Sequence, residues 1–268
     1  MNYEIIVLDI DGTLVNSEKV ITPYTLKVLT NIQKKGKKVA LASGRPVQGI
    51  TGHASTLRLN TFGGYILAYN GGALIDARTN EVIYSKYFPN EIIPEICNEL
   101  KSTNVTVNTY KNDKIIMGNA INSYSGVEAK IIGMDTKFVE DFAGYVTFNI
   151  NKLLLAGDPT DILRLEKSLS KKYRGVIGVF RSEEFFLELV PLGIDKAKSI
   201  DVLLKKLNLT SDQCIACGDA YNDITMIQYA GLGVAMGNAV DEVKSSADVI
   251  TATNDQDGIA KIVEKYMM

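Results

Sequence analysis

The sequence has few of the features that mark secreted, disulfide-linked or membrane-spanning proteins. Its 268 residues include only three cysteines and no tryptophan. Three cysteines are too few for a disulfide framework, and their odd number suits a reducing compartment. No apolar run approaches the ~20 residues that a transmembrane helix needs. Glu4 and Asp9 interrupt the apolar stretch near the amino terminus, so we expect no signal peptide and a cytoplasmic location.

An excess of charge of one sign is also lacking. Lys and Arg together number 29 against 31 Asp and Glu, which gives a formal net charge of -2. A nearly neutral chain has no dominant electrostatic attraction to nucleic acid or to an anionic membrane surface. We therefore expect neither nucleic acid nor membrane as a partner, while the sequence leaves the oligomeric state open.

The composition that is present is that of a globular protein. Hydrophobic residues make up 46% of the chain and charged residues 22%, close to the average of folded domains. At this length the apolar residues can form one large core or two modest ones. These values argue against disorder and against a fibrous protein.

Two of the cysteines have the spacing of a redox or zinc site. Cys214 and Cys217 form a C-x-x-C pair, but the residues between them are apolar, and the sequence shows no second Cys/His pair. We interpret this segment as a buried strand. The single histidine, His53, is likewise expected to have an ordinary surface or packing role.

The amino-terminal segment has the pattern of a parallel α/β sheet. A β-branched, apolar run from Tyr3 to Ile10 predicts a buried strand. Thr22-Pro23 predicts the start of a helix and Gly36 its end. The next apolar run, Lys38 to Ala42, predicts a second buried strand. Strand, helix and strand without regular polar alternation are typical of a parallel sheet.

The character of the sequence changes between residues 87 and 186. A hairpin is expected just before this region, around Arg78 to Asn80. The region itself mixes helical and alternating strand patterns, and the α/β rhythm returns from Asp195 onward. We therefore predict an α/β fold in which a Rossmann-like parallel-sheet core, residues 1–86 and 187–268, carries an inserted α+β cap domain at residues 87–186.

Two carboxylates and a glycine follow the first predicted strand. In Asp9-Ile10-Asp11-Gly12-Thr13 the glycine lets the backbone turn and approach a ligand closely. One carboxylate of such a pair can attack phosphorus, and the other can exchange protons with the leaving group and water. An Asx turn would explain the same Asp-Gly dipeptide. Taken alone, this segment leaves both interpretations open.

Polar residues also follow other predicted strands, whose ends lie at the ligand-binding edge of an open parallel sheet. Ser43-Gly44-Arg45 could hold phosphoryl oxygens or form only a turn. The segment from Gly218 to Asp223 adds two carboxylates and an amide. Carboxylates gathered from separate strands repel one another unless a cation neutralises them, and hard oxygen ligands select Mg²⁺. Lys196 could supply positive charge to an anionic transition state.

Taken together and in this order, the segments resemble the four motifs of the haloacid dehalogenase superfamily. The motifs are Asp9-x-Asp11-Gly12-Thr13, Ser43-Gly44-Arg45, Lys196, and Gly218-Asp219-x-x-Asn222-Asp223. The insertion between the second and third motifs is similar to the large α+β cap, type IIB, of the Cof-type phosphatases. The resemblance covers essentially the whole chain, including Asn70-Gly71-Gly72 and Met236-Gly237-Asn238-Ala239.

The resemblance implies a role for each matching residue. Asp9 is expected to be the nucleophile that forms an aspartyl-phosphate, and Asp11 the general acid and then the general base. Mg²⁺ is expected to be held by the side chains of Asp9 and Asp219 and by the backbone carbonyl of Asp11, with Asp223 in support. Residues expected to bind the phosphoryl group or to order its surroundings are Gly12, Thr13, Ser43, Lys196 and Asn222. Candidates on the substrate side are Arg45, Asn70 and Asn238.

The resemblance thus predicts a Mg²⁺-dependent phosphatase of small phosphorylated metabolites, with sugar phosphates as the expected substrates. Two alternatives stay open. A phosphotransferase or mutase of the same superfamily would pass the phosphoryl group to a second hydroxyl instead of water. A non-enzymatic, phospho-receiver-like module would also place an Asp at a strand end beside Mg²⁺, although Asp11 and the inserted domain favour turnover. Among the aromatic residues of the cap, Tyr124, Tyr145 and Tyr173 are expected mainly to pack its core.

Overall fold

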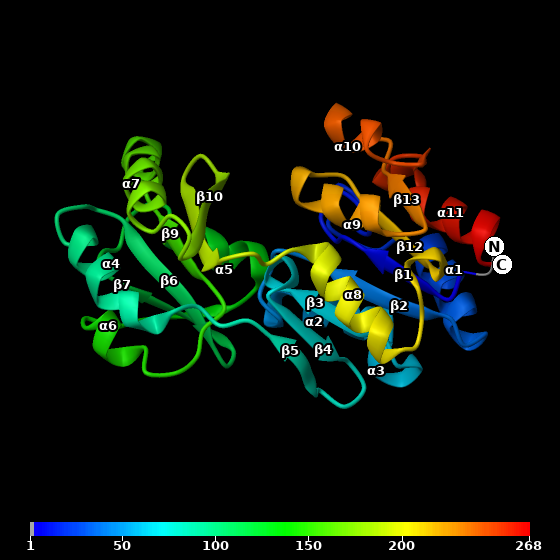
Figure 1. The fold of residues 1–268 in the computed structure, drawn as a ribbon, viewed down its shortest axis with the longest axis horizontal. Coiled ribbons are helices and arrows are strands. Elements are labelled where there is room, and N and C mark those ends of the chain that lie inside the picture. The colour runs from blue at the N-terminus through cyan, green and yellow to red at the C-terminus, as the bar shows by residue number, and fades with distance from the viewer. Residues whose placement is uncertain (1–2) are drawn as a thin grey trace. The chain divides into compact units, whose positions relative to one another are not determined.

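The structure, a computed structural model, describes residues 3–268 and divides into two compact units (Figure 1). The core unit comprises Met1–Ser85 and Asp195–Met268, and the inserted unit comprises Lys86–Ile194. The second boundary therefore lies after Ile194, later in the chain than the expected end of the cap at residue 186. The reason is that β11 (Phe186–Pro191) pairs with two strands of the inserted sheet.

The sheet of the core unit has the strand order β14-β13-β12-β1-β2-β3-β4-β5. The strands from β14 to β3 are parallel, whereas β4 and β5 are antiparallel to their neighbours and form the expected hairpin. The strands are β1 Ile5–Leu8, β2 Lys38–Ala42, β3 Tyr65–Ala68, β4 Ala73–Asp76, β5 Val82–Ser85, β12 Cys214–Gly218, β13 Leu232–Ala235 and β14 Val249–Ile250.

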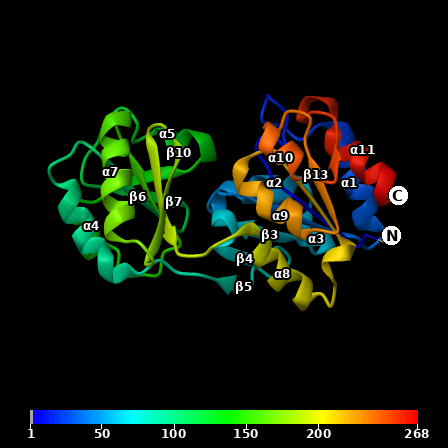
Figure 2. The same cartoon turned by 45° about the horizontal axis from the view of Figure 1, so that its top comes forward.

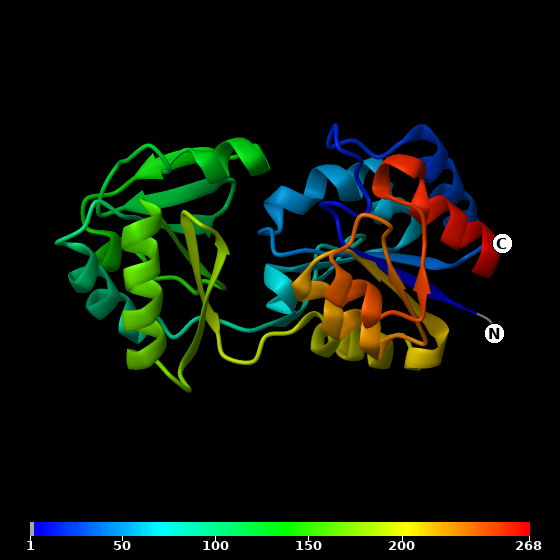
Figure 3. The same ribbon diagram turned by 90° about the horizontal axis from the view of Figure 1, so that it is seen from above.

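Helices cover both faces of this sheet, which explains why its central strands are apolar throughout. Figure 3 shows α1, α2 and α11 on one face and α8 and α9 on the other. All four residues of β1 are buried, as expected for a strand with two covered faces. The helices of the core unit are α1 Pro23–Lys34, α2 Gln48–Thr56, α3 Leu59–Phe62, α8 Lys196–Lys206, α9 Ile224–Tyr229, α10 Asp241–Ser245 and α11 Gly258–Tyr266, with short 3₁₀ turns η1 Tyr69–Gly71, η3 Ser211–Gln213, η4 Tyr221–Asp223 and η5 Asn254–Gln256.

The C-x-x-C segment forms strand β12, as interpreted from its apolar residues. Cys214 and Cys217 are buried and stand three residues apart on this strand, so their side chains point to opposite faces of the sheet. The two thiols therefore do not face one another. Within residues 3–268 no helix combines the length and the apolar character needed to cross a membrane.

The inserted unit has its own mixed sheet, in the order β10-β11-β9-β6-β7-β8. Its pairings are antiparallel except for the parallel pair of β7 and β8. The strands are β6 Thr106–Lys111, β7 Lys114–Gly118, β8 Asp135–Phe138, β9 Leu153–Ala156, β10 Ile177–Glu183 and β11 Phe186–Pro191. The helices are η2 Asn90–Ile92, α4 Ile93–Leu100, α5 Val127–Ile132, α6 Phe142–Tyr145 and α7 Pro159–Lys172.

One face of the inserted sheet carries the main hydrophobic core of this unit. Figure 2 shows α4 and α7 along the same side of the sheet. Leu153 and Leu155 of β9 pack there with α7 and with Tyr173, whereas Leu154 and Ala156 face the other side near α5. The alternation along β9 follows from the two-residue period of a strand. Tyr173 is thus a core residue, as expected from the sequence.

Candidate active site

Strands of the core sheet end beside the residues that the sequence analysis selects. Asp9 follows β1, Ser43 follows β2, Asn70 follows β3, Asp219 follows β12 and Asn238 follows β13. These five strands are parallel neighbours, so their carboxyl ends lie at the same edge of the sheet. Segments separated by more than 200 residues in the sequence therefore meet at one edge.

A buried lysine joins two of these segments. Lys196, the first residue of α8, donates hydrogen bonds from Nζ to Oδ1 of Asp9 at 2.7 Å and to Oδ1 of Asp223 at 2.5 Å. Lys196 is 1% exposed, Asp9 6% and Asp223 0%. Burial alone lowers the pKa of Lys196, but the charges of Asp223 and Asp9 outweigh this effect and hold the pKa above its ordinary value. The side chain is therefore an ammonium ion within the site.

The carboxyl group of Asp9 is also buried, but burial shifts its pKa in the direction opposite to that of Lys196. Burial raises the pKa of Asp9 well above its ordinary value, the charge of Asp223 raises it further, and Lys196 acts against both. Oδ1 of Asp9 accepts the bond from Lys196, whereas Oδ2 has no hydrogen-bond partner among the described residues. A further cation next to Asp9 would favour its ionised form.

Asp219 lies against the loop that follows β1. Its Oδ1 accepts a 2.7 Å hydrogen bond from the hydroxyl of Thr13. Gly12 has φ +78°, and a Cβ atom at this position would overlap Oδ2 of Asp219. Glycine is therefore required both by the left-handed backbone and by the close approach of the carboxylate. Burial, and then the charge of Asp223, raise the pKa of Asp219 to about 6, although the Thr13 hydrogen bond lowers it.

Asp223 organises the turn after β12. Its Oδ2 accepts hydrogen bonds from the backbone N–H groups of Asp219 and Ala220, both at 3.0 Å, while its Oδ1 is bonded to Lys196. Both oxygens of Asp223 are thus occupied. This carboxylate is placed to orient Asp219 and Lys196 rather than to offer a free oxygen to a ligand.

The cluster fits a divalent cation. One carboxylate oxygen from each of Asp9, Asp219 and Asp223 lies within 4.8 Å of the others. The three carboxylates and the Lys196 ammonium together leave two negative charges, which a divalent cation would balance. The donors are hard oxygen atoms, of the kind that bind Mg²⁺, Mn²⁺ or Ca²⁺. Asp9 and Asp219 would each supply one side-chain oxygen, which for Asp219 is Oδ2, the oxygen that is not bonded to Thr13.

Asp11 is held away from this cluster by two basic side chains. The guanidinium group of Arg45 donates from Nε and from a terminal nitrogen to the two oxygens of Asp11, both at 2.8 Å, and Lys19 donates at 3.2 Å. Partial burial raises the pKa of Asp11, but the hydrogen bonds and charges of Arg45 and Lys19 bring it below its ordinary value. In this state Asp11 is an ionised carboxylate.

The second motif is linked to Asn70 and Asn222. Ser43 is buried, and its hydroxyl oxygen accepts a 3.3 Å bond from the backbone N–H of Arg45. The backbone N–H of Asn70 donates to the carbonyl of Ser43 at 2.9 Å, and Oδ1 of Asn70 accepts from the amide of Asn222 at 2.9 Å. The motif thus forms a loop before α2, which begins only at Gln48.

The turn at Asn70 has a strained backbone. Tyr69, Asn70 and Gly71 have consecutive φ values of 55°, 56° and 90°, in the left-handed region that costs non-glycine residues energy. A Cβ atom on Gly71 would overlap the carbonyl oxygen of Asp195, the residue before Lys196. This contact places the Asn70-Gly71-Gly72 turn against the start of α8, where the third motif, Lys196, lies.

Asn238 fastens the loop of the first motif. Its amide donates to the carbonyl of Gly12 at 2.8 Å, and its Oδ1 accepts from the backbone N–H of Asn254 at 3.0 Å. The side chain of Asn254 in turn donates to the carbonyl of Val15 at 2.9 Å. All the site residues selected from the sequence are thus located at or beside these strand ends.

Three contacts were not expected from the sequence. The first is the two-point contact of the Arg45 guanidinium group with Asp11, called the Arg45 fork below. The others are the Lys19–Asp11 bond and the support of Asn238 by Asn254. All three depend on irregular loops. Lys19 belongs to the segment before α1 that has no regular apolar pattern. The sequence offered one sign of the first contact, namely the presence of an arginine, Arg45, in the second motif.

Comparison with known proteins gives a consistent result. A model of the haloacid dehalogenase-like hydrolase family matches residues 6–263. The chain is 29% identical to a Bacillus subtilis protein named 5-amino-6-(5-phospho-D-ribitylamino)uracil phosphatase, over 268 residues that cover 100% of this chain and 97% of that protein.

Solved structures show the same similarity. A haloacid dehalogenase-like hydrolase from Bacteroides thetaiotaomicron is 44% identical, with a TM-score of 0.95 and coverage of 98% of this chain and 99% of that chain. A sugar phosphatase of haloacid dehalogenase subclass IIB is 25% identical, with a TM-score of 0.82 and coverage of 98% of each chain. These results favour an enzyme over a non-enzymatic receiver module. The chain belongs to the haloacid dehalogenase-like hydrolase family and is a phosphatase of small phosphorylated metabolites, with a parallel-sheet core and a cap formed by a second, mixed sheet.

Proposed function

We propose that the protein hydrolyses sugar phosphates in two steps, through an aspartyl-phosphate on Asp9 and with Mg²⁺ as cofactor. The observation that carries this proposal is the contact of the buried Asp9 carboxylate with the Lys196 ammonium at 2.7 Å. One oxygen of Asp9 is held by Lys196, and the other is free to attack phosphorus. A nucleophile of this kind splits a difficult hydrolysis into two easier displacements.

In the first half-reaction, Oδ2 of Asp9 bonds to phosphorus while the bond from phosphorus to the leaving-group oxygen breaks. That oxygen takes a proton from the carboxyl group of Asp11. In the second half-reaction, a water molecule attacks the phosphorus of the aspartyl-phosphate and gives its proton to Asp11. Inorganic phosphate leaves, and the carboxylate of Asp9 is restored. Lys196 and the Ser43 hydroxyl would stabilise negative charge on the transferring group.

Asp11 must leave the Arg45 fork to act in these steps. The fork stabilises the carboxylate, whereas the first proton transfer needs the carboxyl form. The side chain of Lys19 is 66% exposed, so solvent can replace its contact with Asp11 at modest cost, whereas the Arg45 side chain is only 14% exposed and a competing anion is needed to displace its bidentate contact. We infer that substrate entry releases Asp11 from Arg45, which can then contact the substrate.

The metal site is proposed at Asp9 and Asp219, together with the backbone carbonyl of Asp11. Asp223 would support it through the hydrogen bonds to Asp219 and Lys196. When bound, Mg²⁺ would supply positive charge that neutralises the carboxylates and the oxygens of the phosphoryl group. We propose Mg²⁺ rather than another oxygen-binding cation because the oxygen donors form a compact set and Mg²⁺ needs an ordered octahedral geometry.

The names of two similar proteins support a polyhydroxylated leaving group. One is called a sugar phosphatase, and the name of the other specifies a phosphate on a ribityl chain. We expect purified protein with Mg²⁺ to release phosphate faster from sugar and polyol phosphates than from nucleotides or phosphorylated amino acids. A panel of these compounds, assayed for inorganic phosphate, checks the ranking. Faster hydrolysis of nucleotides throughout the panel would contradict the proposed substrate class.

Substitution of the nucleophile tests the covalent mechanism. Asp9→Asn should abolish turnover with the fold retained, because an amide is a poor nucleophile but matches the carboxylate in size. The measurement is phosphate release together with circular dichroism. Asp135→Asn, the same change at an exposed position of β8, is the matched control and should keep full activity. Substantial turnover by folded Asp9→Asn would refute the assignment of Asp9.

Substitution of Asp11 should affect both half-reactions. Asp11→Asn removes proton transfer, an effect typically worth 10²–10⁴-fold. Rapid quench with radiolabelled substrate should show the phosphoenzyme forming more slowly and also persisting longer than in the wild type. If neither rate changes, Asp11 has another role.

Replacement of the metal tests the cofactor. We expect activity to need Mg²⁺, to disappear after chelation and to return when Mg²⁺ is added. Ca²⁺ should inhibit, since its 6–8 ligands and loose geometry allow it to engage both oxygens of Asp9. Titration of each metal into the chelated protein, followed by phosphate release, measures both effects. Equal rates with Ca²⁺, or undiminished activity without metal, would disagree with this proposal.

A further inference from the structure

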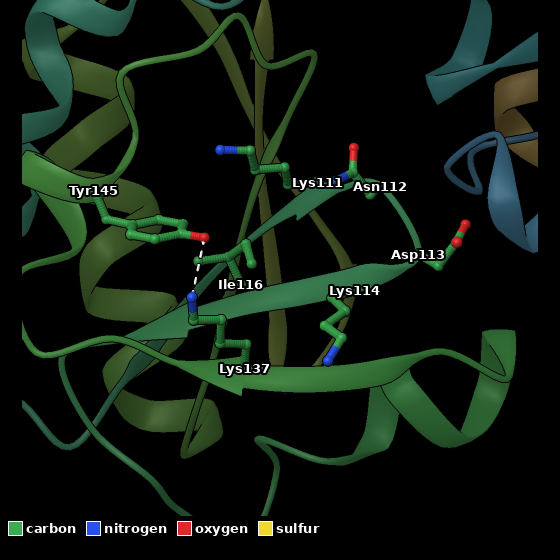
Figure 4. A pocket seen from close by; sticks show the side chains of 7 residues that line it. All are labelled: Lys111, Asn112, Asp113, Lys114, Ile116, Lys137 and Tyr145. Atoms are coloured by element: carbon green, nitrogen blue, oxygen red, sulfur yellow. Dashed lines mark hydrogen bonds between the residues drawn. The ribbon is translucent and has the colours of Figure 1, made fainter.

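The inserted unit has a cavity of about 480 Å³ beside the turn between β6 and β7. Figure 4 shows the side chains that line it, which come from the β6–β7 hairpin, β8 and α6. The lining residues are Lys111, Asn112, Asp113, Lys114, Ile116, Lys137 and Tyr145. All of them belong to the inserted unit, whereas every residue of the proposed mechanism belongs to the core unit.

The cavity has an excess of positive charge. Three lysines line it, and among the described residues none of the three forms an ion pair with a carboxylate, although other lysines of the inserted unit do. Asp113 is the acidic residue of the lining, but Figure 4 shows its carboxylate directed away from Lys137 and Tyr145. Like charges gathered around one cavity repel one another, and a bound anion would offset this repulsion.

Aromatic rings hold two of the ammonium groups in place. Nζ of Lys111 lies 4.1 Å from the centre of the Phe148 ring and 5.3 Å from that of Tyr145. Nζ of Lys137 lies 4.7 Å from the centre of the Tyr145 ring. Such cation–π contacts are attractive within about 6 Å. They restrict two long, flexible side chains and so reduce the entropy that anion binding would cost.

The hydroxyl of Tyr145 adds a directed donor. Nζ of Lys137 donates to this oxygen at 3.3 Å, as the dashed line in Figure 4 shows. Because the oxygen acts as acceptor in this bond, the hydroxyl proton remains available to another acceptor. The cavity thus offers ammonium groups and one hydroxyl to a ligand. Phosphate oxygens, which carry charge and accept several hydrogen bonds, match these donors.

We propose that this cavity is a second ligand site, which binds a small polyanion that carries several phosphate groups. Its volume lies within the ~300–1,000 Å³ of small-molecule sites. The three lysines come from three different strands, β6, β7 and β8, so a ligand with several phosphate groups can contact more of them than a single phosphate can. The lining residues take no part in the proposed chemistry and the site needs no metal, so it can be tested with the catalytic site inactive.

Calorimetric titration of the full-length protein with inorganic triphosphate, in excess chelator and at constant ionic strength, tests the proposal. Without metal, the Asp9, Asp219 and Asp223 cluster is acidic and repels the probe. We expect one saturable site in the wild type. The double variant Lys111→Gln/Lys137→Gln should bind at least tenfold more weakly. Tyr145→Phe keeps the ring that orders the lysines but removes the hydroxyl, and should weaken binding by roughly fivefold.

A charge-matched control separates a defined site from general attraction. Lys167→Gln/Lys171→Gln removes two positive charges from the exposed side of α7, as many as the cavity double variant removes but outside the cavity, and should bind triphosphate as the wild type does. Circular dichroism and thermal unfolding establish that each variant is folded. The proposal is overturned if the wild type shows no saturable binding, if the cavity double variant binds equally well, or if Lys167→Gln/Lys171→Gln loses as much affinity as the cavity double variant.

Discussion

The ion pair of Lys196 with Asp9 and Asp223 is the interaction on which the site depends. Removing charged groups from water costs several kcal/mol per ion unless they are paired and hydrogen-bonded. Here one ammonium group meets two carboxylates that lie 187 and 27 residues away in the sequence. Loss of Lys196 would leave two buried carboxylates without their counter-charge, whereas loss of the Asp9 carboxylate still leaves Lys196 paired with Asp223. The ion pair therefore fixes β1, the turn after β12 and the start of α8 in one arrangement.

The parallel sheet makes this arrangement compatible with a large insertion. The core unit is left at Ser85, the last residue of β5, and is entered again at Asp195, which caps α8 by accepting a bond from the N–H of Ala197 at 2.6 Å. β5 is the edge strand of its sheet, so the inserted residues interrupt no pairing of the central strands. Lys196 follows the insertion directly, yet its position depends on contacts within the core unit.

The sequence predicted best the features that depend on local pattern. Buried strands, the cap of α1 at Thr22-Pro23 and the motif residues follow from apolar runs, a start signal and short spacings. The inserted unit ends later than the sequence pattern predicts, because the apolar run at Phe186–Pro191 is compatible with either sheet and only its pairing with β9 and β10 decides. The Arg45 fork was missed for a similar reason: it depends on how two loops meet.

Asp9 and Asp11 are separated by a single residue, yet their surroundings differ in a way that suits two separate roles. Asp9 is buried and bound to the buried ammonium group of Lys196. Moving the Asp9 side chain would separate two buried charges from one another, which costs free energy. Asp11 is partly exposed and bound to Lys19, whose contact water can replace at modest cost, and to Arg45, whose guanidinium group a substrate phosphate can engage in its place. A nucleophile has to keep a fixed position relative to phosphorus, whereas a proton donor has to follow a leaving group and then a water molecule. The proposed division of roles thus follows from which carboxylate can move, even though the pKa of Asp11 lies below its ordinary value before substrate binds.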